Sequence, residues 1–95
     1  MARRELSGRV VAITGAAGGL GRALVHAFLE RGARVAALDV DEAGLARLAP
    51  EVLALPCDIT RSEACREAVA QILQRFGALD VLVNNAGISH RSLFA

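Results

Sequence analysis

The chain has 95 residues, of which 54% are hydrophobic, and its 11 basic residues nearly balance its 10 acidic ones. This length allows one small domain, and the hydrophobic content favours a packed core over disorder. A net charge of +1 without charge blocks argues against a nucleic-acid surface, and no apolar run approaches the ~18 residues of a membrane span.

The first predicted elements are a buried strand and an amphipathic helix. The β-branched run at 9–14 is bounded by glycines, which is typical of a strand buried on both faces. Apolar residues then recur at helical spacing from Leu20 to Phe28. Gly32 is expected to close this helix, because glycine is the preferred residue at a helix C-terminus.

A second strand–helix–strand unit follows. Residues 34–39 predict a strand, and residues 41–49 predict a short helix with acidic residues in its first turn. Residues 52–57 predict the third strand, with Pro56 near its exit. This unit therefore repeats the alternation of the first.

The last predicted elements are a longer helix and a fourth strand. Thr60 is expected to be the N-cap of the helix, in a capping box with Glu63, and Gly77 is expected to end it. Residues 79–84 predict the fourth strand. The apolar VLV within it carries none of the features that protect the edge of a sheet, so we expect self-association through 79–84 if this strand is an edge.

The order of elements, β-α-β-α-β-α-β, predicts a parallel sheet with right-handed crossovers. We therefore expect an α/β fold with a Rossmann-type doubly wound parallel sheet, here partial, in the strand order 3-2-1-4. No linker or repeat divides the chain.

Four glycines fall between residues 15 and 21, where the first strand turns into the first helix. Backbone N–H groups and the positive end of the helix dipole attract phosphate there, and glycines let the phosphate come close. Asp39 ends the second strand, where an acidic residue can bind the ribose hydroxyls of a dinucleotide. Together these features predict a dinucleotide-binding site.

Three motifs occur in order: TGAAGGLG at 14–21, CDIT at 57–60 and NNAG at 84–87. Together they resemble the motifs of the short-chain dehydrogenase/reductase family, in its single-domain branch. The resemblance runs from about residue 7 to the last residue. It implies hydride transfer between a nicotinamide and a carbon of a small-molecule alcohol or carbonyl substrate, and a homo-oligomer when the enzyme is complete. A methyltransferase of similar topology is disfavoured by these motifs.

The resemblance also implies the cofactor-binding residues. The glycine loop surrounds the pyrophosphate, Asp39 binds the adenosine ribose, the pair after the third strand contacts adenine, and the last motif lines the second ribose. These residues are Gly15, Gly18, Gly19, Leu20, Gly21, Asp39, Asp58, Ile59, Asn85, Ala86 and Gly87. Asn84 is expected instead to tie the central strands together. The alternatives are a structural acid at Asp58 and a simple strand end at Asn85.

We expect NAD rather than NADP as the cofactor. Asp39 would face a 2′-phosphate, and like charges at that distance are unfavourable. The usual places for a compensating cation are empty, since position 18 is glycine and position 40 is valine. Arg22 and Arg34 are the nearest candidates to compensate.

The catalytic residues of the family cannot be assigned within this sequence. It contains no tyrosine and no lysine, so the Tyr-xxx-Lys pair that the family uses for proton exchange is absent. We interpret residues 1–95 as the amino-terminal NAD(P)-binding part of one Rossmann domain, inactive alone, with the remainder absent. The alternative is a non-catalytic nucleotide-binding or interaction module. A coding continuation with Ser and Tyr-xxx-Lys would favour the enzyme.

Other reactive side chains are expected to be structural. Cys57 and Cys65 have no metal-ligand spacing and no disulfide framework, so we expect buried thiols in a reducing cytoplasm. His26 lies between Arg22 and Glu30 at a spacing of four residues, which favours a solvated helix face. No metal site is predicted.

Overall fold

The structure, a computed structural model, describes residues 5–86. Strands and helices alternate along the chain as predicted. Their bounds are β1 Val10–Thr14, α1 Gly19–Glu30, β2 Arg34–Asp39, α2 Glu42–Ala46, β3 Leu53–Pro56, α3 Ser62–Phe76 and β4 Val81–Val83. No helix within the described residues is long and apolar enough to cross a membrane.

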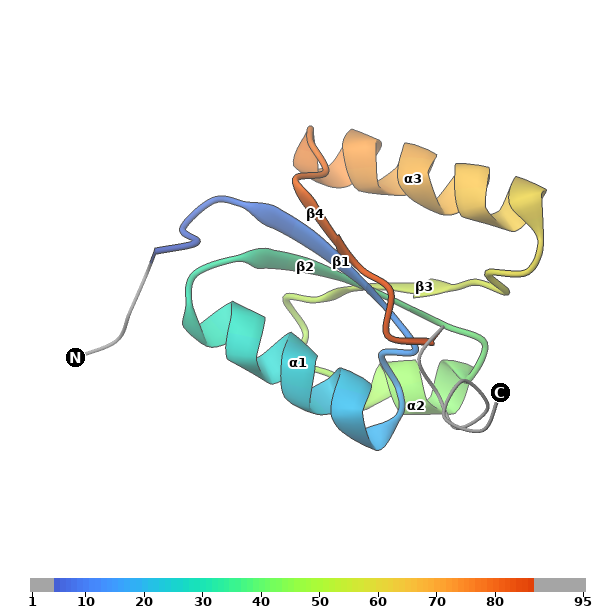
Figure 1. Ribbon diagram of the computed structural model, residues 1–95, viewed down its shortest axis with the longest axis horizontal. Helices are drawn as coiled ribbons and strands as arrows, with labels where there is room; N and C mark the ends of the chain where they lie inside the picture. Colours follow the sequence, from blue (N-terminus) through green and yellow to red (C-terminus); the bar gives the residue numbers. More distant parts are fainter. Residues whose placement is uncertain (1–4, 87–95) are drawn as a thin grey trace, which may run out of the picture.

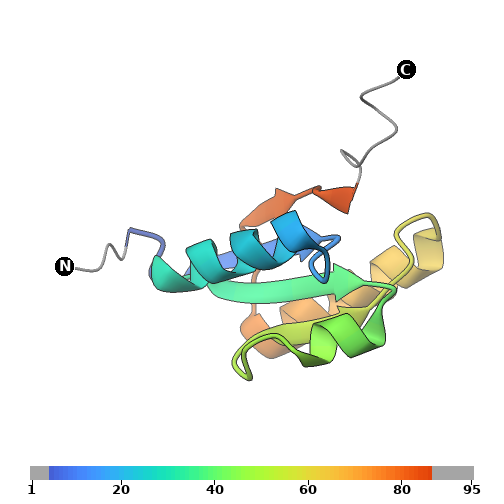
Figure 2. The same ribbon diagram turned by 90° about the horizontal axis from the view of Figure 1, so that it is seen from below.

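The four strands form one parallel sheet in the order β3-β2-β1-β4, which confirms the predicted topology. Ala12 of β1 pairs with Ala36 of β2 on one side and with Leu82 of β4 on the other. Figure 2 shows β4 and β3 at opposite edges of this sheet. All four carboxyl ends therefore meet at one edge of the fold, where parallel α/β proteins bind ligands.

Helices cover both faces of the sheet (Figure 1). Val11 and Ile13 of β1 belong to one apolar cluster, which includes residues of α1 and α2. Val10 and Ala12 point the other way, into a second cluster with Ala68 and Ile72 of α3. Because successive strand residues face opposite sides, β1 contributes to both cores, and all of its residues are buried as predicted.

Glycines end α1 and α3 in the expected places. Gly32 follows the last residues of α1 with φ 91°, and Gly77 caps α3 with φ 81°. These positive φ angles are strained for residues with a Cβ. The sequence signals for these two helix ends are thus confirmed.

The predicted start of α3 is wrong. Its N-cap is Arg61, and no side chain caps the helix. The hydroxyl of Thr60 instead donates to Oδ1 of Asp58 at 2.6 Å, and the Thr60 N–H donates to the same oxygen at 3.0 Å. Local turns of this kind compete with helix capping for short polar side chains, and here the turn at Asp58 prevails over the capping box with Glu63.

Strands β1 and β3 lose at most one residue at each end relative to the prediction, whereas α2 and β4 are shorter by more. Helix α2 spans Glu42–Ala46 instead of 41–49, with the Asp41 carboxylate accepting the Gly44 N–H at 3.0 Å. The registered pairing of β4 with β1 begins at Val81. At Asp80 the backbone N–H still donates to the carbonyl of Val10 at 2.9 Å, but the N–H of Val10 donates to the side-chain Oδ2 of Asp80 at 2.8 Å.

Candidate functional site

A groove of about 510 Å³ opens at the carboxyl ends of the strands. Residues that end or follow each of the four strands line it. Every predicted site residue that the structure describes, from Gly15 to Ala86, lies on its wall. Gly87 lies outside the described residues. The groove therefore brings together the ten described residues that the motifs singled out.

Two glycines of the loop after β1 are required by the fold itself. Gly15 has φ 65°, and a Cβ there would lie 3.0 Å from Nδ2 of Asn85. A Cβ on Gly21 would collide with the carbonyl oxygen of Gly15 and would lie 2.7 Å from Cα of Ala16. The first glycine therefore allows the turn, and the second lets α1 pack closely against the end of β1.

The other two glycines have no such packing reason. A Cβ on Gly18 would make an ordinary contact of 3.6 Å, and a Cβ on Gly19 would meet nothing within 4 Å. Both residues line the groove. Because neither residue has a side chain, their backbone is open to a ligand at the groove surface.

The start of α1 presents backbone donors at this open surface. Gly18 is the N-cap, and the first helical hydrogen bond joins the Arg22 N–H to the Gly18 carbonyl at 2.8 Å. The N–H groups of Gly19, Leu20 and Gly21 therefore precede the helical ladder. No acidic residue lies in the first turn. The arrangement suits an anion of phosphate size at the positive end of the helix dipole.

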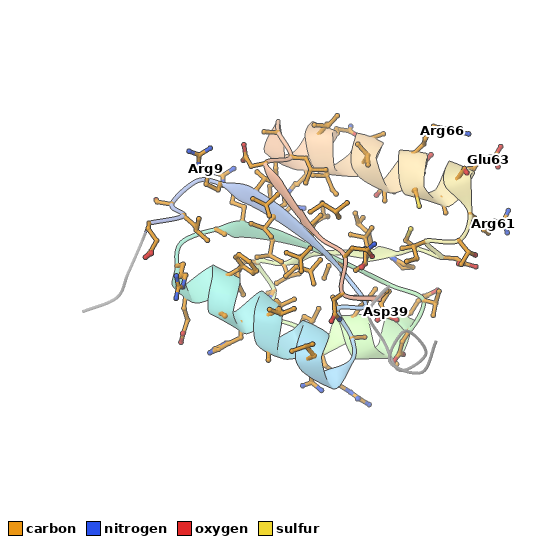
Figure 3. All side chains as sticks on the ribbon, viewed as in Figure 1. Arg9, Asp39, Arg61, Glu63 and Arg66 are labelled. Atoms are coloured by element: carbon orange, nitrogen blue, oxygen red, sulfur yellow. The ribbon has the colours of Figure 1, made fainter. Side chains whose placement is uncertain are left out.

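The carboxylate of Asp39 lies at the end of β2, beside the glycine loop, and also lines the groove (Figure 3). Its Oδ2 accepts the N–H of Ala17 at 3.0 Å, and its Oδ1 accepts the N–H of Asp41 at 2.9 Å. A carboxylate has about four acceptor positions. Two are used by these bonds, which leaves capacity for hydroxyl groups of a ligand.

The segment after β3 adds a charged carboxylate and an apolar side chain. The Thr60 hydroxyl and N–H, with a smaller effect of Arg61, hold the pKa of Asp58 below its usual range. Ile59 beside it is half-buried and packs on the α3 core. The pair can contact a flat polar ring, with a hydrogen-bond acceptor at its edge and an apolar surface below it.

Three residues of the groove were missed by the sequence analysis. Leu38 and Val40 flank the ribose-binding candidate, with Val40 68% exposed, and Cys57 precedes Asp58. Only their position next to motif residues could have indicated them. Burial raises the pKa of the Cys57 thiol, and the neighbouring Cys65 and Asp58 raise it further. Cys57 is buried as expected, whereas Cys65 is only half-buried.

The turn after β4 is held against the glycine loop. The Thr14 hydroxyl donates to Oδ1 of Asn84 at 3.0 Å and accepts the N–H of Ala86 at 3.0 Å. Nδ2 of Asn85 donates to the carbonyl of Gly15 at 3.1 Å. Asn84 thus joins β4 to β1 as predicted. The bond to Gly15 orients the side chain of Asn85, which lines the groove.

The remaining candidates lie outside the groove. His26 is exposed on α1 and lies 3.2 Å from Glu30, which agrees with a solvated helix face. No group of three or more His, Cys, Asp or Glu residues between positions 5 and 86 could hold a metal ion.

Known proteins resemble this chain in sequence. The family model described as short chain dehydrogenase matches residues 9–95. An L-fucose dehydrogenase of Bos taurus is 45% identical over 84 residues, which cover 85% of this chain and 31% of that protein. A sorbitol dehydrogenase of Cereibacter sphaeroides is 39% identical over 88 residues, which cover 88% of this chain and 34% of that protein. The chain thus spans about a third of the length of these relatives.

The fold also resembles solved structures. A 3-ketoacyl-(acyl-carrier-protein) reductase from Brucella melitensis, complexed with NADH, superposes with a TM-score of 0.80 at 33% identity. The match covers 93% of this chain and 41% of that one.

Proposed function

The chain belongs to the short-chain dehydrogenase family, and on that premise we propose that its groove binds NAD(H) for hydride transfer to or from a small-molecule alcohol or carbonyl carbon. The observation that carries the proposal is that residues of all three motifs and Asp39 meet in one groove. The N–H groups at the start of α1 and the Asp39 carboxylate, which is bonded to Ala17 of the same loop, both border this groove. Phosphate and ribose of a dinucleotide require these two kinds of group.

In this proposal each segment holds one part of the dinucleotide. The N–H groups of Gly19 to Gly21 bind the pyrophosphate, and Asp39 accepts from the adenosine ribose. Asp58 accepts from the adenine amino group, with Ile59 against the ring. Asn85 and Ala86 line the second ribose. The bound nicotinamide supplies the hydride donor or acceptor, and the chain orients it.

The structure supports a preference for NAD over NADP. No arginine lines the groove among the described residues. Arg34 begins β2, at the opposite end from Asp39, and its guanidinium lies 6.0 Å from the centre of the Phe76 ring. Arg22 lines a second pocket, which borders the groove at Gly19. Neither of these arginines lines the groove beside Asp39.

The Tyr-xxx-Lys pair that the family uses for proton transfer is not among these 95 residues. The sequence holds no tyrosine and no lysine, and general acid–base catalysis is typically worth about 10²–10⁴ in rate. We therefore propose that these 95 residues bind the cofactor without catalysing turnover alone, and that the complete enzyme is a homo-oligomer.

Calorimetric titration of the chain with NAD⁺ and with NADP⁺ tests the cofactor proposal. We expect NAD⁺ to bind at least about tenfold more tightly, because a like charge at hydrogen-bond distance commonly shifts an equilibrium by that much or more. Equal or tighter binding of NADP⁺ would contradict the role given to Asp39.

A further inference from the structure

The carboxylate of Asp39 connects two turns that border the groove. One oxygen accepts the N–H of Ala17, which lies 22 residues earlier in the centre of the glycine loop, at 3.0 Å. The other accepts the N–H of Asp41, the N-cap of α2, at 2.9 Å. Figure 3 labels Asp39 at this junction. One side chain therefore fixes the loop after β1 and the turn after β2 relative to each other.

Few other bonds hold the centre of the loop. The N–H of Ala16 donates to the carbonyl of Leu38 at 3.2 Å, and that of Gly18 donates to Gly15 at 3.3 Å. Between them, the N–H of Ala17 has Asp39 as its acceptor. Ala17 is half-buried, and an amide that loses its acceptor in such a place is destabilised. The path of the loop therefore depends on the carboxylate.

We infer that Asp39 is a positioning residue of the phosphate-binding loop, in addition to the ribose role given to it above. By holding Ala17 it fixes the chain one residue before the N-cap Gly18, and so aims the N–H groups of Gly19 to Gly21 at the pyrophosphate. The part that concerns pyrophosphate rests on the proposed function. The hydrogen bond to Ala17 does not.

This positioning role and simple electrostatic repulsion predict opposite changes in anion affinity when the carboxylate is removed. A carboxylate beside an anion site repels the anion, so its removal should strengthen anion binding. If the carboxylate orders the donors, its removal should weaken anion binding instead, because the donors then lose their common direction. Inorganic pyrophosphate separates the two effects, since it carries no ribose for Asp39 to bind.

The experiment uses the full chain with Asp39→Ala and Asp39→Asn. Asn offers one acceptor oxygen to two N–H donors, so it keeps the shape of the side chain but at least one of the two bonds is lost. We expect the amide of Ala17 in Asp39→Ala to exchange with solvent at least about tenfold faster, as the loss of a bond to a charged acceptor implies. In Asp39→Asn the amide of Ala17 or that of Asp41 should exchange with solvent faster than in the parent chain. Both variants should bind inorganic pyrophosphate more weakly than the parent chain.

Glu63→Gln is the matched control. It also removes a carboxylate, but Glu63 is exposed in the first turn of α3 and does not line the groove. This variant should leave exchange at Ala17 unchanged and should not weaken pyrophosphate binding. Unchanged exchange at Ala17 in Asp39→Ala would overturn the inference, as would faster exchange with unchanged or tighter pyrophosphate binding. A parent chain that binds neither NAD⁺ nor pyrophosphate would defeat the proposed function and the pyrophosphate part of the inference, while exchange at Ala17 would still test the hydrogen bond.

Discussion

Substitution of alanine at two glycines of the same loop should separate a packing glycine from a ligand glycine. At Gly21 a Cβ would collide with the Gly15 carbonyl oxygen and would lie 2.8 Å from the carbon of that carbonyl. Both are backbone atoms, so no side chain can rotate away and α1 must move from β1. At Gly19 a Cβ would meet nothing within 4 Å, and this residue lines the groove.

The expected effects on stability differ accordingly. Alanine gains about 1 kcal/mol over glycine inside a helix, and overpacking costs about 1–3 kcal/mol or more. Because the clash at Gly21 is with backbone, we expect the upper end, a net loss of about 2 kcal/mol for Gly21→Ala. In a domain of this size that lowers Tm by about 8–16 °C. Gly19→Ala, at the first residue of α1 and without a clash, should leave stability unchanged or raise it by up to about 1 kcal/mol.

The assay is urea unfolding followed by far-ultraviolet circular dichroism, since the chain has no tryptophan or tyrosine to report by fluorescence. Isothermal titration calorimetry measures the affinity of each variant for NAD⁺. Gly19→Ala should bind NAD⁺ at least about tenfold more weakly, because its methyl group keeps a charged phosphate from the N–H donors. A Gly21→Ala variant as stable as the parent, or a Gly19→Ala variant with unchanged affinity, would refute the reasoning.

Three further predictions concern single side chains. Thr60→Val should raise the pKa of Asp58, because the hydroxyl that lowers this pKa is removed. As the pH falls, the stability that the ionised carboxylate contributes is then lost at a higher pH than in the parent chain. Carbon-detected NMR titration measures the pKa of Asp58. Iodoacetamide at pH 8 should alkylate Cys65 before Cys57, whose thiol is buried with a raised pKa, as peptide mass spectrometry would show. Leu82→Lys should reduce self-association in sedimentation velocity, because Leu82 is 61% exposed on the outer strand β4; a monomeric parent chain would contradict this.

Much of the fold follows from local patterns that the sequence displays directly. The apolar run of β1 and the 3.6-residue spacing of α1 each depend on neighbours only a few residues away. The end of the second strand predicted Asp39 at the site, whereas Asn85 was assigned to it through the family resemblance. The strand order followed from the same alternation and from the family resemblance.

The features that could not be predicted depend on competing hydrogen bonds or on contacts between residues far apart in the sequence. Thr60 had two possible hydrogen bonds, and only the folded turn shows that Asp58 receives it. Asp39 meets Ala17 across 22 residues, a contact that no local pattern encodes. The four glycines of the loop look alike in sequence, yet coordinates are needed to show that Gly21 has no room for a Cβ and that Gly19 has ample room.

The central claim is that the groove at the carboxyl ends of the strands binds NAD(H), and titration of the isotopically labelled chain with NAD⁺ tests it most directly. We predict saturable shifts of backbone amide resonances at 15–21, 38–40, 57–59 and 85–86, with little change in the second half of α3. Shifts that do not saturate, or that cluster instead in the second pocket around Arg22, His26 and Arg47, would contradict the account.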